Sequence, residues 1–375
     1  MKVGYRASMD NEQHIRITPR TDPVAPERLA EILADPGFGL HLTDHMFVAE
    51  WTPESGWHDA RITAYAPISM DPATAVLHYA QEIFEGLKAY RHDDGSVWTF
   101  RPEENAARMV RSARRLALPE LPEPDFVASV DALIRTDERW VPGAPGERSL
   151  YVRPFMFASE SFLGVRPAKH VTYMVIASPA GSYFAKGVRP VSIWLSAEYA
   201  RAGVGGTGAA KTGGNYASSL VAQQEASENG CDQVAFLDTV ERKWVEELGG
   251  MNLYFVYDDG SIVTPALSGT ILEGITRASI IELCGKLGRR VVERRFSIDE
   301  WRDDVRSGRI VEVFACGTAA VVTPIGLLRW RGGEVSSGGP TGDQTGPVTH
   351  ELRQALVDIQ YGRAEDTFGW MHRVV

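Results

Sequence analysis

The sequence has only three cysteines, and their positions, 231, 284 and 316, show no spacing typical of a metal site or a disulfide. No apolar run approaches the ~20 residues that cross a membrane, and the N-terminal segment lacks the apolar centre of a secretory signal. Lysine and arginine (39) are outnumbered by aspartate and glutamate (49), so the net charge is −10. A nucleic-acid partner needs a basic face, which this balance disfavours. We therefore expect a cytoplasmic protein that uses no metal and binds neither nucleic acid nor membrane.

A length of 375 residues is typical of two domains and allows a large core. The composition changes over residues 178–189, where proline, glycine and serine favour an irregular connection. We therefore predict an N-terminal domain over residues 1–177, a linker over 178–189 and a C-terminal domain over 190–375.

Hydrophobic patterns divide the chain into helices and strands, which indicate a mixed α+β and α/β fold. The expected helices cover residues 26–33, 73–84, 105–116, 125–141, 216–229, 275–287, 297–307 and 347–360. The expected strands cover residues 45–51, 87–90, 97–100, 150–157, 170–177, 191–195, 233–237, 244–247, 252–257, 261–264 and 310–315. A glycine-rich stretch over residues 332–346 is expected to be a flexible loop.

One lysine lies in a glycine-rich stretch from Val204 to Leu220, which reads VGGTGAAKTGGNYASSL. Between Gly205 and Gly214 only the side chain of Lys211 is larger than threonine, so a flat ligand can approach the backbone closely. An amine with few solvating partners loses its proton more easily and becomes a nucleophile. We therefore predict that Lys211 forms a Schiff base with pyridoxal phosphate.

The same stretch has two other interpretations. Residues 203–208 match the G-x-G-x-x-G pattern of dinucleotide-binding proteins, with Glu225 near the distance of a ribose partner, and residues 205–212 resemble a phosphate-binding loop. Both mechanisms need a strand that ends at the first glycine and a helix that opens at the last. The expected strand 191–195 ends too early for this, and residues 213–215 (Gly-Gly-Asn) would break such a helix, so both interpretations are disfavoured.

Eight motifs follow one another along the chain in an order typical of one enzyme family. They are Phe84-Glu-Gly-Leu-Lys-Ala-Tyr-Arg91, Asn105-Ala-Ala-Arg-Met109, Tyr151-Val-Arg-Pro154, Leu163-Gly-Val165, AAKTGGNYASSL, Glu247-Leu-Gly-Gly-Met-Asn252, TPALSGTILEGITR and Gly317-Thr-Ala319. From about Phe38 to Trp370 the chain resembles the branched-chain amino acid aminotransferases of the fold-type IV pyridoxal-phosphate family. The resemblance implies a smaller N-terminal α/β domain and a larger C-terminal domain with a pseudo-barrel of strands flanked by helices.

The resemblance also implies which residues bind the ring of the cofactor. Lys211 would carry the covalent link and move a proton between the substrate Cα and the cofactor. Glu247 would keep the pyridine nitrogen protonated, and Tyr216 would hydrogen-bond the ring oxygen O3′. From local chemistry alone, Glu247 could equally be a surface acid at the end of a strand.

The phosphate of the cofactor needs several hydrogen-bond donors. By resemblance, Arg108 would supply the positive charge, although its run RMVRSARR could equally be a solvated helix face. The backbone N–H groups of Thr270 and Ile271, together with Thr318, would complete the phosphate site. We expect a helix to open at Gly269-Thr-Ile, because a helix N-terminus favours an anion.

The substrate pocket must accept leucine, isoleucine and valine, and also the acidic side chain of glutamate. By resemblance, the apolar wall comprises Phe38, Tyr79, Phe84, Tyr183 and Ala319, with Thr318 beside them. Tyr151 and Arg153 would form the polar corner that receives the acidic substrate. Leu163 and Val165 would complete the active site of a neighbouring subunit, which implies a homodimer.

The implied reaction is the transamination of L-leucine, L-isoleucine or L-valine with 2-oxoglutarate. A D-amino acid aminotransferase or an aminodeoxychorismate lyase of the same fold is the alternative, and a nucleotide-binding protein is a more distant one. The chain departs from many relatives at Gly250, where they carry threonine, which puts one side-chain contact near the ring of the cofactor in doubt.

Overall fold

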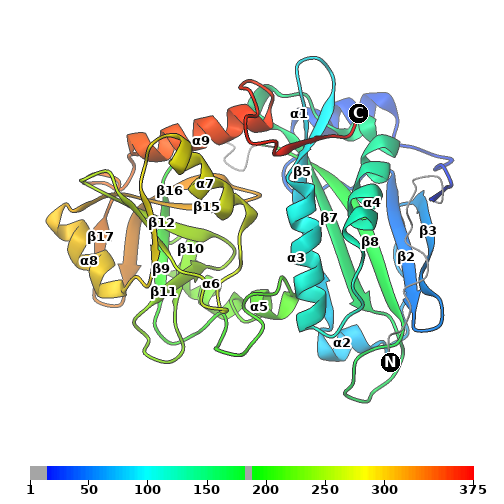
Figure 1. Ribbon diagram of the computed structural model, residues 1–375, viewed down its shortest axis with the longest axis horizontal. Coiled ribbons are helices and arrows are strands. Elements are labelled where there is room, and N and C mark those ends of the chain that lie inside the picture. The colour runs from blue at the N-terminus through cyan, green and yellow to red at the C-terminus, as the bar shows by residue number, and fades with distance from the viewer. Residues whose placement is uncertain (1–14, 182–187) are drawn as a thin grey trace. The chain divides into compact units, whose positions relative to one another are not determined.

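The computed structural model describes residues 15–181 and 188–375, and the chain groups into two compact units (Figure 1). The first unit contains Met1–Tyr183, Ala210–Gly213 and Ile359–Val375. The second unit contains Phe184–Ala209 and Gly214–Asp358. The chain therefore returns to the first unit twice, once for the four residues around Lys211 and once at its C-terminus.

This division differs from the expected one at both ends of the second unit. Strand β8 (Val171–Ala180) extends into the expected linker, of which residues 182–187 lie outside the described part. The C-terminal strand β18 (Met371–Arg373) pairs with β6 (Val97–Phe100) in the first unit. The C-terminal segment Ile359–Val375 therefore groups with the first unit. The cause is long-range strand pairing, which composition does not reveal.

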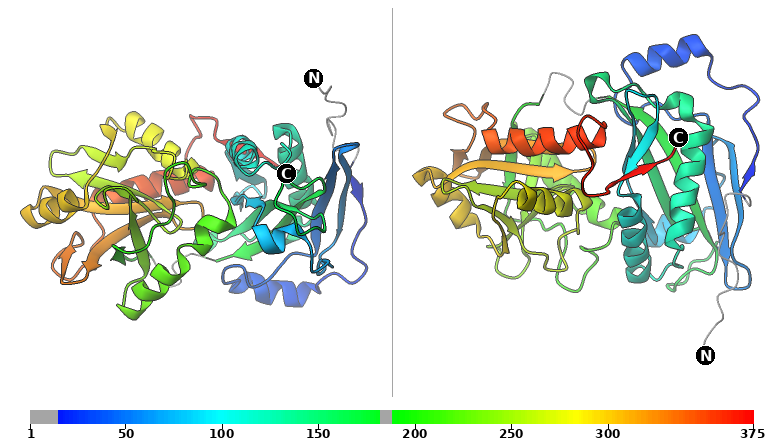
Figure 2. Two further views of the ribbon diagram at one scale, coloured as in Figure 1. Left: turned by 90° about the horizontal axis from the view of Figure 1, so that it is seen from below. Right: turned by 45° about the horizontal axis from the view of Figure 1, so that its top comes forward.

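A nine-stranded sheet forms the first unit within the described residues, in the order β1-β3-β2-β8-β7-β5-β6-β18, with β4 paired to β7. Figure 2 shows that helices α3 and α4 lie side by side against it. Its remaining strands are β1 (Arg16–Ile17), β2 (His45–Thr52), β3 (Gly56–Ala64), β4 (Glu82–Phe84), β5 (Leu87–Arg91) and β7 (Ser149–Ala158). Its helices are α1 (Pro26–Ala34), α2 (Ala75–Tyr79), α3 (Pro102–Arg115) and α4 (Glu123–Thr136).

Alternation along β7 decides which side chains enter the core of this unit. Leu150, Val152 and Met156 belong to the main hydrophobic cluster, together with residues of α3 and α4. Because successive side chains of a strand point to opposite faces, Tyr151 and Arg153 project from the other face. The sequence Tyr-Val-Arg-Pro therefore presents two polar side chains away from the core.

A second nine-stranded sheet forms the second unit, in the order β11-β10-β9-β16-β15-β12-β13-β14, with β17 paired to β16. Its strands are β9 (Val191–Ser196), β10 (Gln233–Leu237), β11 (Val245–Leu248), β12 (Asn252–Tyr257), β13 (Ile262–Pro265), β14 (Val291–Arg294), β15 (Ile310–Gly317), β16 (Val321–Trp330) and β17 (Gly333–Ser336). Its helices are α6 (Leu220–Glu228), α7 (Ile275–Lys286), α8 (Ile298–Ser307) and most of α5 (Gly213–Ala217) and α9 (Pro347–Gln360).

Helices cover both faces of this second sheet. On one face Phe255 stacks on Phe296 and meets Trp301 of α8 edge to face. On the other face Tyr254 stacks on Phe314, and its hydroxyl donates to the Arg277 carbonyl in α7. Adjacent residues of β12 therefore serve two cores, which explains why this strand is apolar throughout rather than alternating.

Most of the predicted elements are present, and the regions that differ from prediction include strands β1, β14 and β18, which were not expected. The expected helix 73–84 ends at Tyr79, where Ala80 adopts a left-handed conformation (φ 48°), and the chain continues as β4. The expected helix 216–229 is divided into α5 and α6, and the expected loop 332–346 contains β17. Strand β16 was not predicted. No helix in the described ranges is long and apolar enough to cross a membrane.

Candidate active site

The backbone of Lys211 is fixed on both sides within the first unit. The Lys211 N–H donates to Ser112 Oγ of α3 (3.0 Å), and the Lys211 carbonyl accepts from the Phe84 N–H of β4 (3.0 Å). The Lys211 amine lies 4.9 Å from the centroid of the Phe84 ring. The lysine is therefore held against a strand that β7 supports through Phe84–Phe155 pairing.

Four predicted substrate residues continue from Lys211 in one unbroken series of contacts, which we call the lysine cluster. The Arg153 guanidinium lies 4.8 Å from the centroid of Phe84, and its Nη2 donates to the Tyr151 hydroxyl (2.9 Å). The Tyr151 ring meets Phe38 edge to face at 5.0 Å. Arg153 Nε is buried without a hydrogen-bond partner among the described residues. A buried donor without an acceptor is costly, so this corner is suited to an anionic group of a ligand.

The glycine of the Phe-Glu-Gly motif is required by the position of Tyr151. A Cβ atom at Gly86 would lie 2.2 Å from Tyr151 Oη. Strands β4 and β5 are separated by Glu85 and Gly86, and the Glu85 N–H donates to the Pro154 carbonyl (2.7 Å). Gly86 therefore lets the phenol cross the gap between the two strands and reach Arg153.

The remaining predicted substrate residues of the first unit are not part of the lysine cluster. The Tyr79 hydroxyl donates to the Leu163 carbonyl, whereas the Leu163 and Val165 side chains are 67% and 88% exposed. Glu160 and Arg166 close the base of this loop through two hydrogen bonds (2.7 and 3.0 Å). Tyr183 lies outside the described residues. The loop is thus well defined, and its apolar side chains are presented to solvent in a single chain.

Arg108, the predicted source of charge for the phosphate, forms a buried pair with Glu85. Its Nε and Nη2 each donate to a Glu85 carboxylate oxygen at 2.8 Å, and the side chains are 4% and 0% exposed. Burial by itself raises the pKa of the Glu85 carboxyl, but Arg108, Lys211 and Asn105 outweigh it, so the pKa is below its usual value. The solvated-face interpretation of Arg108 is therefore wrong, because α3 turns this arginine inward.

We expect Glu85→Gln to lower the free energy of unfolding at pH 7 by about 2 kcal/mol, because Arg108 loses its charged hydrogen-bond partner. A folded-state pKa below the unfolded one means that this stabilisation is present above the unfolded pKa of about 4.3 and is lost as the pH falls. Urea unfolding from pH 7 to pH 3 should therefore show the two chains converging only below about pH 4.

Glu120→Gln is the matched control for this prediction. It removes an exposed ion pair with Arg114 (2.7 Å), and it should cost less than about 1 kcal/mol. An equal cost for the two variants would contradict the assigned role of the buried pair.

A glutamate outside the eight motifs also contacts the lysine segment. Glu82 Oε1 accepts hydrogen bonds from the Gly213 N–H and from Thr212 Oγ1 (3.2 Å). Burial raises the pKa of the Glu82 carboxyl above its usual value, although these bonds and the Arg153 charge oppose the shift. Sequence reasoning missed Glu82, because nothing local indicates a partner 131 residues away.

In the second unit, Glu247 is buried and not at the surface. Its Oε1 accepts from the Leu272 N–H (2.7 Å) and lies 2.9 Å from Nη1 of Arg201, and both side chains are 2% exposed. Arg201 Nη1 also donates to the Thr270 carbonyl (3.0 Å). A buried carboxylate of this kind is suited to lie beside a protonated ring nitrogen, which carries positive charge. Arg201 was not predicted, since it lies in an irregular segment without any motif.

The predicted phosphate residues Thr270 and Ile271 are not at a helix N-terminus. Helix α7 begins only at Ile275, with Gly274 as its N-cap, so the helix-dipole argument is wrong. Within residues 15–181 and 188–375, however, neither backbone N–H has a hydrogen-bond partner, although both residues are buried. Because the Thr270 carbonyl points to Arg201, the trans peptide directs the Ile271 N–H away from it. These two donors are suited to an anion.

Small residues bring the other predicted cofactor residues of the second unit together. A Cβ atom at Gly250 would lie 3.8 Å from Cε1 of Tyr216, and a Cβ atom at Gly317 would lie 3.4 Å from the Gly250 carbonyl oxygen. Thr318 and Ala319 follow in the turn between β15 and β16. A threonine at position 250 would therefore touch the edge of the Tyr216 ring, a contact that Gly250 does not make.

The structure contradicts the two nucleotide interpretations of the glycine-rich stretch. Strand β9 ends at Ser196, well before Gly203, and no helix begins before α5 at Gly213. Glu225 lies within α6 and not at the end of a strand. The geometry that either phosphate-binding mechanism requires is therefore absent from this described segment.

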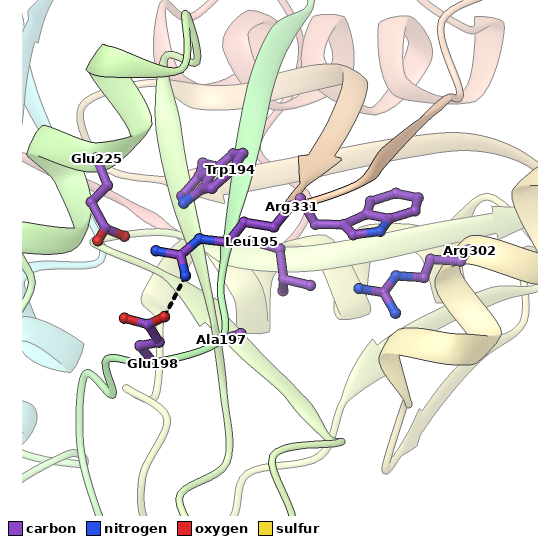
Figure 3. Close-up of a pocket in the computed structure, with 8 residues that line it drawn as sticks. Trp194, Leu195, Ala197, Glu198, Glu225, Arg302 and Arg331 are labelled. Carbon is purple, nitrogen blue, oxygen red and sulfur yellow. Dashed lines mark hydrogen bonds and ion pairs between the residues drawn. The ribbon is translucent and has the colours of Figure 1, made fainter.

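A cavity in the second unit, about 230 Å³ in volume, shares no residue with the predicted cofactor and substrate sites (Figure 3). Trp194, Leu195 and Arg302 contribute to its wall, and the Arg331–Glu198 pair (2.6 Å) lies across it. Since no lysine, serine, threonine or cysteine lines it, we do not assign the chemistry to it.

A family model described as amino-transferase class IV matches residues 82–328, and the chain belongs to this family. A probable branched-chain-amino-acid aminotransferase of Streptomyces coelicolor is 58% identical over 358 residues, which are 96% of this chain and 98% of the relative. The crystal structure of the Escherichia coli branched-chain amino acid aminotransferase gives a TM-score of 0.74 at 28% identity, covering 88% of this chain and 99% of that one.

A third comparison bears on the cofactor. The T.th. branched-chain amino acid aminotransferase, solved with pyridoxamine 5′-phosphate, gives a TM-score of 0.72 at 30% identity, covering 87% of this chain and 98% of that one. The predicted family and its mixed α/β fold are therefore confirmed.

Proposed function

We propose that this chain catalyses the reversible transamination of L-leucine, L-isoleucine and L-valine with 2-oxoglutarate, using pyridoxal phosphate. The observation that carries the proposal is the lysine cluster, which places one lysine beside an aromatic wall and an arginine. The aromatic wall suits a branched aliphatic side chain, and the arginine suits the second carboxylate of glutamate. The sequence relatives and solved structures described above carry this activity in their names.

The residues present fit the cofactor in three respects: a lysine for the covalent link, a buried carboxylate for the ring nitrogen and unpartnered donors for the phosphate. Bound pyridoxal phosphate supplies an electron sink that allows an amino acid to give up its amino group. Lys211 Nζ would take the proton from the substrate Cα and later return it, since an amine is a base and, once protonated, an acid. Glu247 would hold a proton at the ring nitrogen, and Tyr216 would donate a hydrogen bond to the ring oxygen.

Four residues would hold the phosphate. The Thr270 and Ile271 N–H groups donate to its oxygens, which gives these two buried donors the acceptors that the protein does not provide. Thr318 adds a hydroxyl donor. Arg108 adds positive charge, while Glu85 keeps its guanidinium in a fixed orientation.

In the first unit, Phe38, Tyr79 and Phe84 would contact the substrate side chain. A glutamate side chain meets Arg153 Nε, which is buried without a partner, and the Tyr151 hydroxyl. One pocket thereby accepts both apolar and acidic substrates, because the polar groups lie at one corner and the rest of the wall is apolar.

Gly86→Ala should separate these two substrate classes. Because the added methyl group would displace Tyr151 Oη, the bond to Arg153 is lost while the aromatic wall remains. We expect KM for 2-oxoglutarate to rise about fivefold, the equivalent of one hydrogen bond of about 1 kcal/mol, with little change for the oxo acid of leucine. Steady-state kinetics with both acceptors measures this. Gly285→Ala, where an added Cβ meets open space, is the control, and equal changes for both acceptors would contradict the assignment.

We further propose a homodimer in the cytoplasm. The exposed Leu163 and Val165 side chains on a closed, well-defined loop support a role in a second subunit. The three cysteines are free and buried, which is compatible with a reducing compartment. Sedimentation equilibrium of the purified chain tests the dimer, and a monomer at micromolar concentration would exclude it.

Assays with L-leucine, D-alanine and aminodeoxychorismate test the reaction directly. The proposal expects L-leucine to convert the visible absorption of the bound cofactor in a half-reaction, and 2-oxoglutarate to restore it. Conversion by D-alanine alone would favour a D-amino acid aminotransferase. A chain that binds no pyridoxal phosphate would exclude the whole class.

A further inference from the structure

We propose that Glu82 is a positioning residue of the active site, which fixes Lys211 through the backbone of the two residues that follow it. The inference rests on the proposed function of Lys211. It concerns a residue outside all eight motifs, in a strand that sequence patterns predict to be helix.

The Glu82 side chain points to the same face of β4 as Phe84. In β4, Ile83 enters the main hydrophobic core, so Glu82 and Phe84 project from the opposite face. Phe84 lies under the Lys211 amine on this face. Glu82 is therefore on the same side of the strand as the lysine, one strand repeat away.

Hydrogen bonds with Ser112, Phe84 and Glu82 hold the segment 211–213. Ser112 Oγ accepts from the Lys211 N–H, and the Phe84 N–H donates to the Lys211 carbonyl. Glu82 accepts from the Gly213 N–H and from Thr212 Oγ1. The first two bonds fix the peptides on either side of Lys211. Glu82 fixes the next turn of the backbone, so the lysine cannot pivot about its carbonyl end.

A carboxylate at position 82 reduces the stability of the fold. Burial raises the pKa of the Glu82 carboxyl, so the ionised carboxylate is less favourable in the fold than in water and costs stability. Because Oε1 alone accepts both hydrogen bonds, a neutral amide of the same length can take its place. The role of Glu82 therefore lies in its acceptor oxygen and not in its charge.

The close approach of Glu82 to Gly213 is a further link between the glutamate and this segment. A Cβ atom at Gly213 would lie 2.6 Å from Glu82 Oε1, so any other residue at position 213 would force this carboxylate to shift. The glycine-rich composition after Lys211 is thus explained here by a protein contact as well as by room for a ligand.

Three substitutions distinguish position from charge. Glu82→Gln keeps the length and an acceptor oxygen but removes the charge. Glu82→Asp keeps the charge but is too short by one methylene to reach Gly213. Glu82→Ala removes both. The proposal expects Gln to retain activity, and Asp and Ala to fail alike.

The expected result is a fall in kcat with L-leucine of about tenfold or more for Asp and Ala, at nearly unchanged KM, because a displaced catalytic group slows chemistry more than binding. Glu82→Gln should remain within about threefold of the natural chain. A second readout does not depend on turnover. Pyridoxal phosphate is added to apoprotein, borohydride traps the covalent product at intervals, and peptide mapping quantifies the tag on Lys211. Trapping should slow in parallel for Asp and Ala.

Each outcome is decisive. Activity retained in Glu82→Asp but lost in Glu82→Gln would show that the charge matters, and it would overturn the positioning role. Natural trapping rates in all three variants would overturn it as well. Lowered unfolding midpoints with natural kcat would reduce Glu82 to a structural residue. Failure of the proposed function is recognised separately, because borohydride would then tag no lysine, or a different lysine, in the natural chain.

Discussion

Lys211→Ala is expected to abolish covalent binding of pyridoxal phosphate and to reduce transamination of L-leucine by at least about a thousandfold. The substitution removes both the attachment point and the general acid–base, and the second of these alone is worth roughly 10²–10⁴-fold in rate. The cluster that surrounds the amine stays in place, because Ser112 and Phe84 bind the backbone of residue 211 and not its side chain. Loss of the visible cofactor band and of the borohydride-trapped peptide measures the effect.

Lys169→Ala is the matched control for that experiment, because Lys169 is an exposed lysine of the same unit. It should keep the band, the trapped peptide and the activity. If Lys211→Ala retained a trapped peptide elsewhere in the chain, the assignment of the covalent link would be wrong. Unchanged urea unfolding of the apoprotein would show that the loss in Lys211→Ala comes from chemistry and not from misfolding.

The lysine cluster shows how far the sequence predicted the site. Lys211, Phe84, Tyr151, Arg153 and Phe38 were all assigned in advance, and the structure brings them into contact. Four of these five residues lie in short motifs whose neighbours restrict where each can lie in the fold, whereas Phe38 lies in none of the eight motifs. Gly86 is one such neighbour. The position of Tyr151 in the structure explains why the motif needs a glycine there.

The partners of these residues could not be predicted in the same way. Glu82 reaches Gly213 across 131 residues, and Arg201 contacts Glu247 and Thr270 from an irregular segment. Local patterns report propensity and periodicity, whereas such contacts are set by the pairing of distant strands. Glu82 was further hidden because residues 73–84 have a helical pattern that the left-handed Ala80 interrupts.

Because local patterns do not reveal distant contacts, the helix start near Thr270 and Ile271 was predicted wrongly. A helix was expected to start at Gly269, and its N-terminus was the reason for placing a phosphate there. Helix α7 starts later, yet the two N–H groups are still available, because Arg201 binds the Thr270 carbonyl and so fixes the peptide. The predicted donors were retained, but a buried arginine and not a helix dipole orients them.

Arg201→Met is expected to destabilise the apoprotein by about 3–5 kcal/mol, because it leaves Glu247 buried without its charged partner. It also removes the donor to the Thr270 carbonyl, so the affinity for pyridoxal phosphate should fall together with stability. Urea unfolding of the apoprotein and a fluorescence titration with the cofactor measure the two effects. Arg331→Met is the control in the same unit. It breaks the exposed pair with Glu198, whose side chains are 73% and 57% exposed, and should cost less than about 1 kcal/mol.

The double variant Arg201→Met, Glu247→Met separates stability from chemistry. With both charges replaced by apolar side chains, the free energy of unfolding should return to within about 1 kcal/mol of the natural value or exceed it. Activity should not return, because no carboxylate remains to hold the proton at the ring nitrogen. If the double variant recovered transamination, Glu247 would have no role at the cofactor. If it stayed as unstable as the single variant, the pair would contribute to stability through packing rather than through charge.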